Sequence, residues 1–235
     1  MGTIMAVDKD RTFHEQRIAE WAKYEIGAVR VDTMHEAITR LINGGEFLFV
    51  VINEDTIVDF TEQLPVMRDI TNTPIFVFTN SYTIKKKIKA MELGADMYDP
   101  HNTYVKDDVL EALEILKVQN RWATKPPNHL PLLVCGDIIL SPLRRSVFVR
   151  DVKISLTKIE FDILEYLMIN DGIILTHTQI LRTIWGGEHG EISHDVLWSA
   201  IKRLREKLRV SPGSPTYIVS EREIGYCFSH RTAKG

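Results

Sequence analysis

Two almost entirely apolar segments, Phe47–Ile52 (FLFVVI) and Pro74–Thr79 (PIFVFT), constrain the fold of this chain more than any other feature. Each segment is rich in β-branched and aromatic residues, and neither alternates between apolar and polar positions. Such a run is typical of a β-strand that is buried on both faces, as strands are in parallel sheets. Both faces are covered only when helices pack on each side of the sheet. The two segments therefore predict the centre of an α/β fold.

The rest of the first half alternates between strand and helix patterns. Thr33 and Glu36 have the spacing of a capping box, in which two side chains satisfy the first N–H groups of a helix. The predicted strands are Thr3–Val7, Val29–Val31, Phe47–Ile52, Pro74–Thr79 and Met97–Asp99, and the predicted helices lie at about 14–24, 34–43, 64–70, 85–93 and 107–121. This order predicts a five-stranded, parallel, doubly wound sheet of the α/β class.

Polar side chains stand where these predicted strands end. In a doubly wound sheet, binding and chemistry take place beyond the carboxyl ends of the strands. The residues expected there are Asp8, Lys9, Asn53, Thr79 and His101. The segments TIMAVDKD, FVVIN, PIFVFT and GADMYDPHN resemble a response-regulator receiver domain in order and spacing, over about residues 1–122. This resemblance implies a flavodoxin-like domain.

The resemblance also implies a phosphorylation pocket with altered parts. A working receiver takes phosphate on an aspartate and uses two further acids for Mg²⁺, a hydroxyl and a lysine. Asn53 stands at the acceptor position, and an amide cannot form an acyl phosphate. Lys9 replaces one acid beside Asp8, and His101 replaces the lysine, whereas Thr79 keeps the hydroxyl. Mg²⁺ prefers anionic oxygens, so we expect no metal in this degenerate pocket.

Three roles for the first half stay open from the residues. It regulates without aspartyl phosphate, it takes phosphate on a shifted acceptor at Asp55, or it senses a small ligand in the degenerate pocket. Tyr98 matches the family's switch aromatic. The helix at 85–93 and the helix after Tyr98 match the family's dimer face, so the resemblance implies a homodimer through the receiver domain.

A linker at 123–130 (ATKPPNHL) is expected between a receiver-like domain at 1–122 and a second domain at 131–235. The segment contains a proline pair and has no apolar periodicity. The elements predicted after it are β segments at 137–140, 146–149 and 153–156, helices that begin near 158, 177 and 193, and strands at 217–220 and 226–229. Two of these helices follow capping-box pairs, Thr157 with Glu160 and Thr176 with Gln179.

The segment Ser193–Arg209 (SHDVLWSAIKRLREKLR) predicts an amphipathic helix with a basic side. Its apolar stripe consists of Leu197, Ile201, Leu204 and Leu208. A second stripe, about 100° further round the helix, consists of Trp198, Lys202, Arg205 and Arg209. One side can be buried while the other offers cations to an anionic partner. A charged outer face alone is more often only a solvated surface.

The surrounding motifs favour DNA as that partner. SLTKIEFDILEYL, ILRTIWG, DVLWSAIKRLREKL and IVSEREIGYCF resemble the OmpR/PhoB-type effector domain over about residues 132–229. The resemblance implies an α+β winged helix-turn-helix domain whose third helix enters the major groove of double-stranded DNA. The implied DNA-binding residues are Trp198, Ser199, Lys202, Arg203 and Arg205 on the helix, and Ser220 and Arg222 on the wing. Trp185 matches a position that can touch DNA or RNA polymerase; core packing is the alternative.

Composition supports a globular DNA-binding protein. The 235 residues are 44% hydrophobic and 26% charged. Residues 1–129 hold 15 Lys+Arg and 20 Asp+Glu, a charge of −5, whereas residues 130–235 hold 14 and 12, a charge of +2. A mildly basic second half fits a polyanionic partner.

The remaining expectations concern location and chemistry. No apolar run reaches about 18 residues, no signal-peptide pattern is present, and only Cys135 and Cys227 occur, which fits a reduced, cytoplasmic protein. The sequence has no Gly-rich phosphate loop and no GxSxG motif, so we expect neither an enzyme nor a cofactor. We expect a bacterial transcription regulator that binds repeated half-sites as a dimer.

Overall fold

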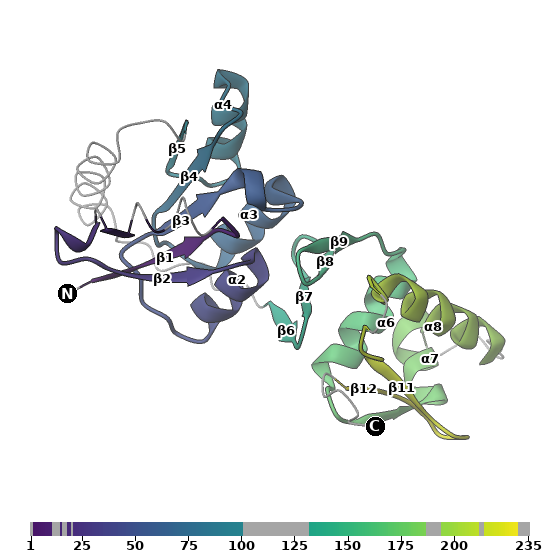
Figure 1. The fold of residues 1–235 in the computed structure, drawn as a ribbon. Helices are drawn as coiled ribbons and strands as arrows, with labels where there is room; N and C mark the ends of the chain where they lie inside the picture. Colours follow the sequence, from purple (N-terminus) through teal and green to yellow (C-terminus); the bar gives the residue numbers. More distant parts are fainter. Residues whose placement is uncertain are drawn as a thin grey trace. The chain divides into compact units, whose positions relative to one another are not determined.

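The computed structural model describes residues 2–10, 15, 18, 19, 21–100, 132–186, 194–211 and 214–229. The chain divides into two units, residues 1–130 and residues 131–235 (Figure 1). Several sequence-based predictions lie outside the described residues: His101, the helix at 107–121 and the linker at 123–130.

A five-stranded parallel sheet forms the centre of the first unit, as the sequence predicted. The strand order is β2-β1-β3-β4-β5. The strands are β1 (Thr3–Val7), β2 (Gly27–Val31), β3 (Val50–Asn53), β4 (Ile75–Thr79) and β5 (Met97–Pro100). The predicted start of β3 at Phe47 was wrong. Val50 is the first β3 residue that is paired with β1 and with β4.

Helices cover this sheet and fix its loops. They are α2 (Met34–Ile42), the short 3₁₀ helix η1 (Glu54–Thr56), α3 (Phe60–Ile70) and α4 (Ile84–Glu92). The Thr33 hydroxyl oxygen accepts the N–H of Glu36 at 3.0 Å and caps α2. Only this half of the predicted capping box is observed, because the Glu36 carboxylate accepts from Arg40 in the next turn of the helix. In Figure 1, α2 and α3 lie side by side against the sheet. Trp21, Phe49 and Phe76 form a buried aromatic cluster within the same unit.

The order of the strands decides where a site forms. The chain runs from β1 to β2 on one side and enters β3 on the other side of β1. The carboxyl ends of β1 and β3 therefore flank the point at which the strand order reverses. Ligands of open α/β sheets bind at this point, and Asp8 and Asn53 stand there.

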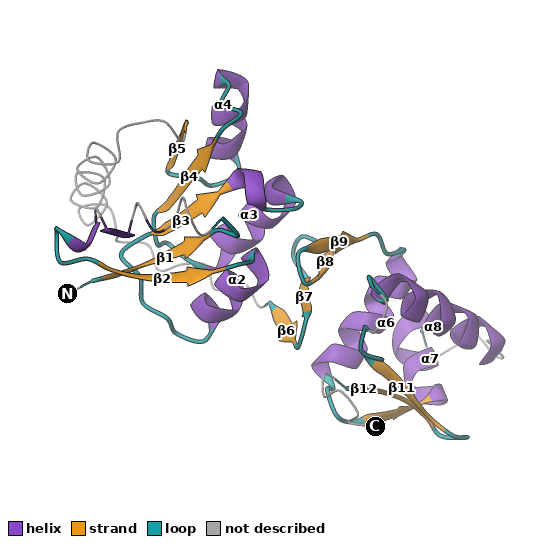
Figure 2. Ribbon diagram, viewed as in Figure 1, coloured by secondary structure: helices purple, strands orange, loops and turns teal. Residues whose placement is uncertain are grey.

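The second unit combines two antiparallel sheets with three described helices (Figure 2). Its elements are β6 (Leu133–Cys135), β7 (Ile138–Ser141), β8 (Ser146–Val149), β9 (Val152–Ile154), α6 (Lys158–Ile169), β10 (Ile174–Thr176), α7 (His177–Trp185), α8 (His194–Leu208), β11 (Ile218–Glu221) and β12 (Gly225–Phe228). β6 to β9 pair in chain order, and the second sheet has the order β10-β12-β11. β6 and β10 were not predicted, because three residues are too few to show strand alternation.

Local capping signals and long-range packing agree in this unit. Both predicted capping boxes, Thr157 with Glu160 and Thr176 with Gln179, are confirmed. A single apolar core joins residues from β7, β8, all three helices and both strands of the terminal hairpin. None of the helices in the described ranges is long and apolar enough to cross a membrane.

Candidate nucleic-acid interface and sheet-edge pocket

Helix α8 buries its predicted apolar stripe and leaves a polar and aromatic surface exposed. The four stripe leucine and isoleucine residues lie in the core of the second unit. On the outside, Trp198 is 59% exposed, and Lys202 Nζ lies 5.6 Å from the centre of its ring. A cation over an indole face is attracted to the ring. Ser199, next to Trp198 in the chain, is half-buried. Trp198, Ser199 and Lys202 all belong to the predicted set of DNA-binding residues.

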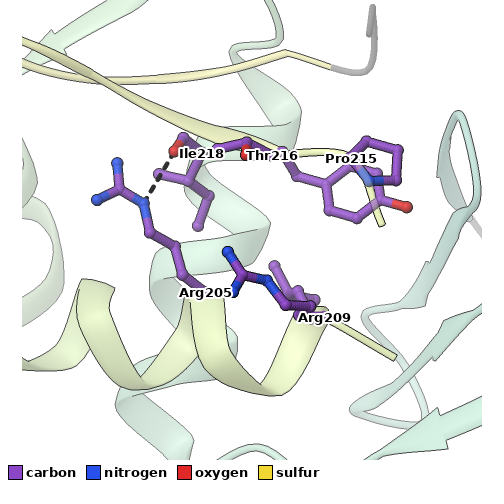
Figure 3. Close-up of a pocket in the computed structure, with 7 residues that line it drawn as sticks. Arg205, Arg209, Pro215, Thr216 and Ile218 are labelled. Atoms are coloured by element: carbon purple, nitrogen blue, oxygen red, sulfur yellow. Dashed lines mark hydrogen bonds between the residues drawn. The ribbon is translucent and has the colours of Figure 1, made fainter. Parts of the chain in front are cut away.

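Arg205 points from α8 toward the wing, the hairpin of β11 and β12. Its Nε donates to the backbone oxygen of Ile218 at 2.9 Å (Figure 3). Its Nη2 donates to Ser220 Oγ at 2.8 Å. Its guanidinium carbon lies 5.6 Å from the centre of the Tyr226 ring. Burial lowers the pKa of Arg205, although an arginine of this kind stays charged at neutral pH. Two predicted DNA-binding residues, Arg205 and Ser220, thus bind each other and hold the wing against α8.

A small hollow lies beside this contact, between the end of α8 and the segment that leads to β11. Arg205, Arg209 and Thr216 are among its lining residues (Figure 3). Its volume of about 40 Å³ has room for little more than one or two water molecules. Arg209 is exposed and adds a cation on the wing side of α8. The sequence placed Arg209 on the basic stripe but not among the DNA-binding residues.

The other flank of α8 is tied to α6 through Glu160. The Glu160 carboxylate is 1% exposed and accepts from Lys207 Nζ at 2.6 Å and from Arg203 Nε at 3.3 Å. It also accepts the backbone N–H of Thr157, as a capping box requires. Burial alone would raise the pKa of Glu160, but the bonds from Lys207 and Thr157 outweigh burial and lower it.

Arg203 therefore makes a contact within the unit and is also partly exposed. One edge of its guanidinium is held by Glu160, while its side chain is 57% exposed and can still reach a partner. The capping-box motif identified Glu160 from the sequence as a helix-capping residue. Its ion pairs with two cations of α8 were not predicted. Nothing local could have signalled it, because Glu160 and Lys207 are 47 residues apart.

The wing carries Arg222 at its tip, in the turn between β11 and β12. The Arg222 side chain is 95% exposed, and its Nε lies 3.8 Å from Glu223 Oε1. An ion pair this exposed contributes little, so Arg222 stays available to an anionic partner. Trp185, at the end of α7, is partly buried and packs against the core of the unit, which favours the packing alternative for this residue.

The sheet-edge pocket of the first unit brings Asp8 and Asn53 together. Asn53 Nδ2 donates to Asp8 Oδ1 at 2.9 Å, and the backbone N–H of Asp10 donates to the same oxygen at 2.8 Å. The hydroxyl of Thr56 lies 3.4 Å from it. Both Asp8 and Asn53 are buried. The amide is thus oriented as a hydrogen-bond donor to the carboxylate.

The second carboxylate oxygen of Asp8 is enclosed. Among the described residues, Oδ2 of Asp8 has no hydrogen-bond partner, and the whole residue is only 3% exposed. Burial raises the pKa of Asp8 above its usual value, although the donors from Asp10 and Asn53 act in the opposite direction. Lys9, its neighbour in the chain, is exposed to solvent.

Thr79, at the end of β4, meets Asp55 rather than Asn53. The Thr79 hydroxyl donates to Asp55 Oδ1 at 2.8 Å, and the backbone N–H of Asn80 donates to Asp55 Oδ2 at 2.6 Å. Asp55 belongs to η1, which the Asn53 side chain caps by accepting the Asp55 N–H at 3.2 Å. The structure describes four of the five predicted pocket residues, Asp8, Lys9, Asn53 and Thr79. Asp8 is hydrogen-bonded to Asn53, whereas Thr79 is hydrogen-bonded to Asp55.

Tyr98, on β5, is completely buried, and its hydroxyl donates to Glu54 Oε2. Burial and the Glu54 carboxylate raise the pKa of Tyr98, so its hydroxyl stays protonated and keeps donating at neutral pH. Lys86 Nζ on α4 lies 3.6 Å from Glu54 Oε1. Glu54 therefore links η1 to both β5 and α4.

Helix α4 exposes an apolar face. Ile84, Ile88 and Met91 are 66%, 55% and 42% exposed, and they recur at i, i+4 and i+7, on one side of the helix. Lys85 and Lys89 are exposed on the same helix. An exposed apolar face of a helix is typical of a surface that binds another molecule.

Comparisons with known proteins place both units in context. Residues 151–228 match the family model described as transcriptional regulatory protein, C terminal. The KDP operon transcriptional regulatory protein KdpE of Escherichia coli (strain K12) is 30% identical over 170 residues, which cover 72% of this chain and 73% of that protein. Response regulator MprA of Mycobacterium sp. (strain KMS) is 28% identical over 229 residues, 95% of each protein. The solved structure of response regulator DrrB, a Thermotoga maritima OmpR/PhoB homolog, is 23% identical, covers 97% of this chain and 99% of that chain, and has a TM-score of 0.41.

Proposed function

This chain belongs to the OmpR/PhoB-type response regulators, which are DNA-binding regulators of transcription, and we propose that it works without phosphorylation of an aspartate. One observation carries the proposal: the amide of Asn53, the residue that matches the family's acceptor position, donates to the Asp8 carboxylate. An amide nitrogen in this position offers no oxygen nucleophile to a phosphodonor.

The pocket is also a poor fit for Mg²⁺. This ion takes about six oxygen ligands in a nearly octahedral arrangement. Asp8 Oδ1 is already occupied by N–H donors, Asn53 presents a donor instead of an oxygen, and a lysine follows Asp8 in the sequence. A single enclosed oxygen, Asp8 Oδ2, does not make a magnesium site. We therefore assign no metal-dependent step to these residues.

Incubation with a small-molecule phosphodonor and Mg²⁺ should leave the mass of the protein unchanged. The physical reason is the amide at Asn53 and the engagement of both Asp55 oxygens by Thr79 and Asn80. Intact-protein mass spectrometry measures the outcome, and a receiver protein with an aspartate acceptor is the positive control. A stable adduct mapped to Asp55 would establish the alternative, a phosphorylation-dependent regulator with a shifted acceptor.

We propose that α8 reads the major groove and the wing contacts the adjacent backbone. Support comes from an outward surface that joins an exposed aromatic side chain to cations. The proposed contact residues are Trp198, Ser199, Lys202, Arg203, Arg205, Ser220 and Arg222. Within this set, Arg205 and Ser220 act together, because their hydrogen bond fixes the wing to α8.

Lys202→Ala is expected to weaken specific DNA binding by about 1–3 kcal/mol if the lysine reaches a base edge. Arg203→Ala is expected to fall in the same range, with a smaller loss if its bond to Glu160 keeps it off the DNA. Affinity should be measured at several salt concentrations by fluorescence anisotropy, on a promoter fragment identified by genomic binding-site mapping. Lys158→Ala, an exposed cation at the start of α6, serves as the matched control. Unchanged binding by both α8 variants would rule out the assignment of the recognition helix.

We further propose a homodimer through the receiver domain that binds repeated half-sites in the cytoplasm, with RNA polymerase as a second partner. The exposed apolar face of α4, with its lysines, supports the dimer. Sedimentation of the untreated protein tests it. A strict monomer that dimerises only with a metabolite would instead favour a ligand-sensing receiver.

A further inference from the structure

Two histidine side chains of the second unit meet at the point where two helices begin. His177 is the first residue of α7, and His194 is the first residue of α8. The centres of their imidazole rings lie 5.2 Å apart, and the ring planes are inclined by 45°. This angle lies between the parallel and the edge-on arrangements that packed aromatic rings prefer. His194 is exposed and His177 is half-buried, so the pair is open to solvent.

The terminal hairpin holds His177 in place. Its ring packs edge-on against Tyr226 of β12, with 5.4 Å between the ring centres. Its backbone N–H donates to the backbone oxygen of Ile224, in the wing turn, at 3.2 Å. Within the described part of the chain, neither imidazole of the pair uses a ring nitrogen in a hydrogen bond or an ion pair. Each neutral ring therefore has a nitrogen lone pair that is available to a ligand.

The spacing of the two rings fits a single metal ion between them. Zn²⁺ binds histidine nitrogen at about 2.0–2.1 Å with tetrahedral geometry, which places the centres of two bound imidazoles roughly 5 Å apart. The observed 5.2 Å agrees with this spacing. Imidazole suits Zn²⁺, Cu²⁺ and Ni²⁺, whereas Mg²⁺ and Ca²⁺ prefer oxygen ligands. Asp195, which follows His194, adds negative charge to the first turn of α8.

We propose that His177 and His194 form a binding site for a divalent transition-metal ion of the Zn²⁺ class, which bridges the starts of α7 and α8. Among the described residues, no third His, Cys, Asp or Glu joins the pair. The bound ion therefore keeps open positions for exchangeable ligands, unlike the ion of a closed structural site. A site with two protein ligands binds its ion reversibly, so its occupancy follows the concentration of the metal.

The location of the site links the ion to DNA, and this part of the proposal rests on the proposed function. His194, Trp198 and Lys202 recur at i, i+4 and i+8, so they share one side of α8. That side is the surface proposed to read the major groove. The ion adds positive charge at the start of this surface, and its open positions can accept a phosphate oxygen. Zn²⁺ should therefore tighten DNA binding.

The test titrates Zn²⁺ into the full chain after a chelator has removed bound metal. At equimolar Zn²⁺, we expect the ring NMR signals of His177 and His194 to shift together, and the second unit to melt roughly 4–8 °C higher because the ion binds only the folded form. Mg²⁺ at the same concentration should have neither effect. Calorimetry should show that His177→Ala and His194→Ala each weaken Zn²⁺ binding by about tenfold or more.

Two further variants separate a lost ligand from a disturbed fold. His194→Cys replaces one zinc ligand by another and should retain binding. His35→Ala removes a histidine of α2 in the first unit and should bind Zn²⁺ as the wild type does. Ring signals that stay in place at equimolar Zn²⁺, or wild-type affinity in both alanine variants of the pair, would overturn the proposal.

DNA affinity with and without Zn²⁺, measured on the same samples, distinguishes this proposal from the proposed function. Zinc binding that leaves DNA affinity unchanged overturns the link between the ion and DNA and leaves the recognition helix intact. Unchanged DNA binding by Lys202→Ala and Arg203→Ala, together with normal zinc binding, overturns the recognition helix and leaves the metal site intact.

Discussion

Gly225→Ala is expected to lower the free energy of unfolding of the second unit by about 3 kcal/mol, at the upper end of the range for overpacking. Gly225 begins β12 and lies between two strands, opposite Thr176 of β10 and Glu221 of β11. A Cβ atom at this position would lie 1.9 Å from the backbone oxygen of Leu175. That atom belongs to a paired strand and cannot rotate away, so the β10–β12 ladder has to open.

Chemical denaturation of the full chain measures this effect, with hydrogen exchange of the β12 amides as a local readout. Gly27→Ala is the matched control, because a Cβ there meets Thr3 Oγ1 at 3.5 Å, an ordinary contact. The substitution is also expected to affect DNA binding, because β12 is one of the two strands that form the wing. Wild-type stability and wild-type exchange in Gly225→Ala would mean that the strands are less closely packed than their register indicates.

Glu160→Ala should destabilise the second unit by about 2–3 kcal/mol. The change removes a capping-box side chain, which contributes about 1 kcal/mol, and leaves two cations of α8 without their buried partner. Lys207 and Arg203 are partly exposed and can regain water, which keeps the loss below that of a fully buried pair. Glu160→Gln keeps an acceptor for the Thr157 N–H and should lose less than half as much.

The pH dependence gives a second test of the Glu160 contacts. The pKa of Glu160 is lowered in the folded protein from an ordinary value of 4.5, so the charged form is stabilised by folding. Its contribution is complete above pH 4.5 and is lost as the pH falls through the lower, folded-state value. The stability difference between wild type and Glu160→Gln should therefore shrink as the solution is acidified below 4.5. A difference that stays constant as the pH falls well below 4.5 would show that the charge of the Glu160 carboxylate does not contribute to stability.

The sequence was most informative where local patterns control the outcome. Uninterrupted apolar runs predicted central strands that are buried on both faces, and the burial of every residue of β3 and β4 confirmed it. Paired caps at Thr157 and Thr176 predicted two helix starts, because a cap satisfies N–H groups only a few residues away. The strands β6 and β10 were not predicted, because three residues show no periodicity. Each is defined by its pairing with another strand, β7 for β6 and β12 for β10.

The sequence by itself determined the two architectures and the buried face of α8, since these follow from residue type and spacing. Only the tertiary structure decided which charged groups meet. Arg203 is held by Glu160, Arg205 by the wing, and Asp55 by Thr79. Each of these partners lies 13 to 43 residues away in the chain. Packing between separate elements sets such distances, and no local pattern of side chains records that packing.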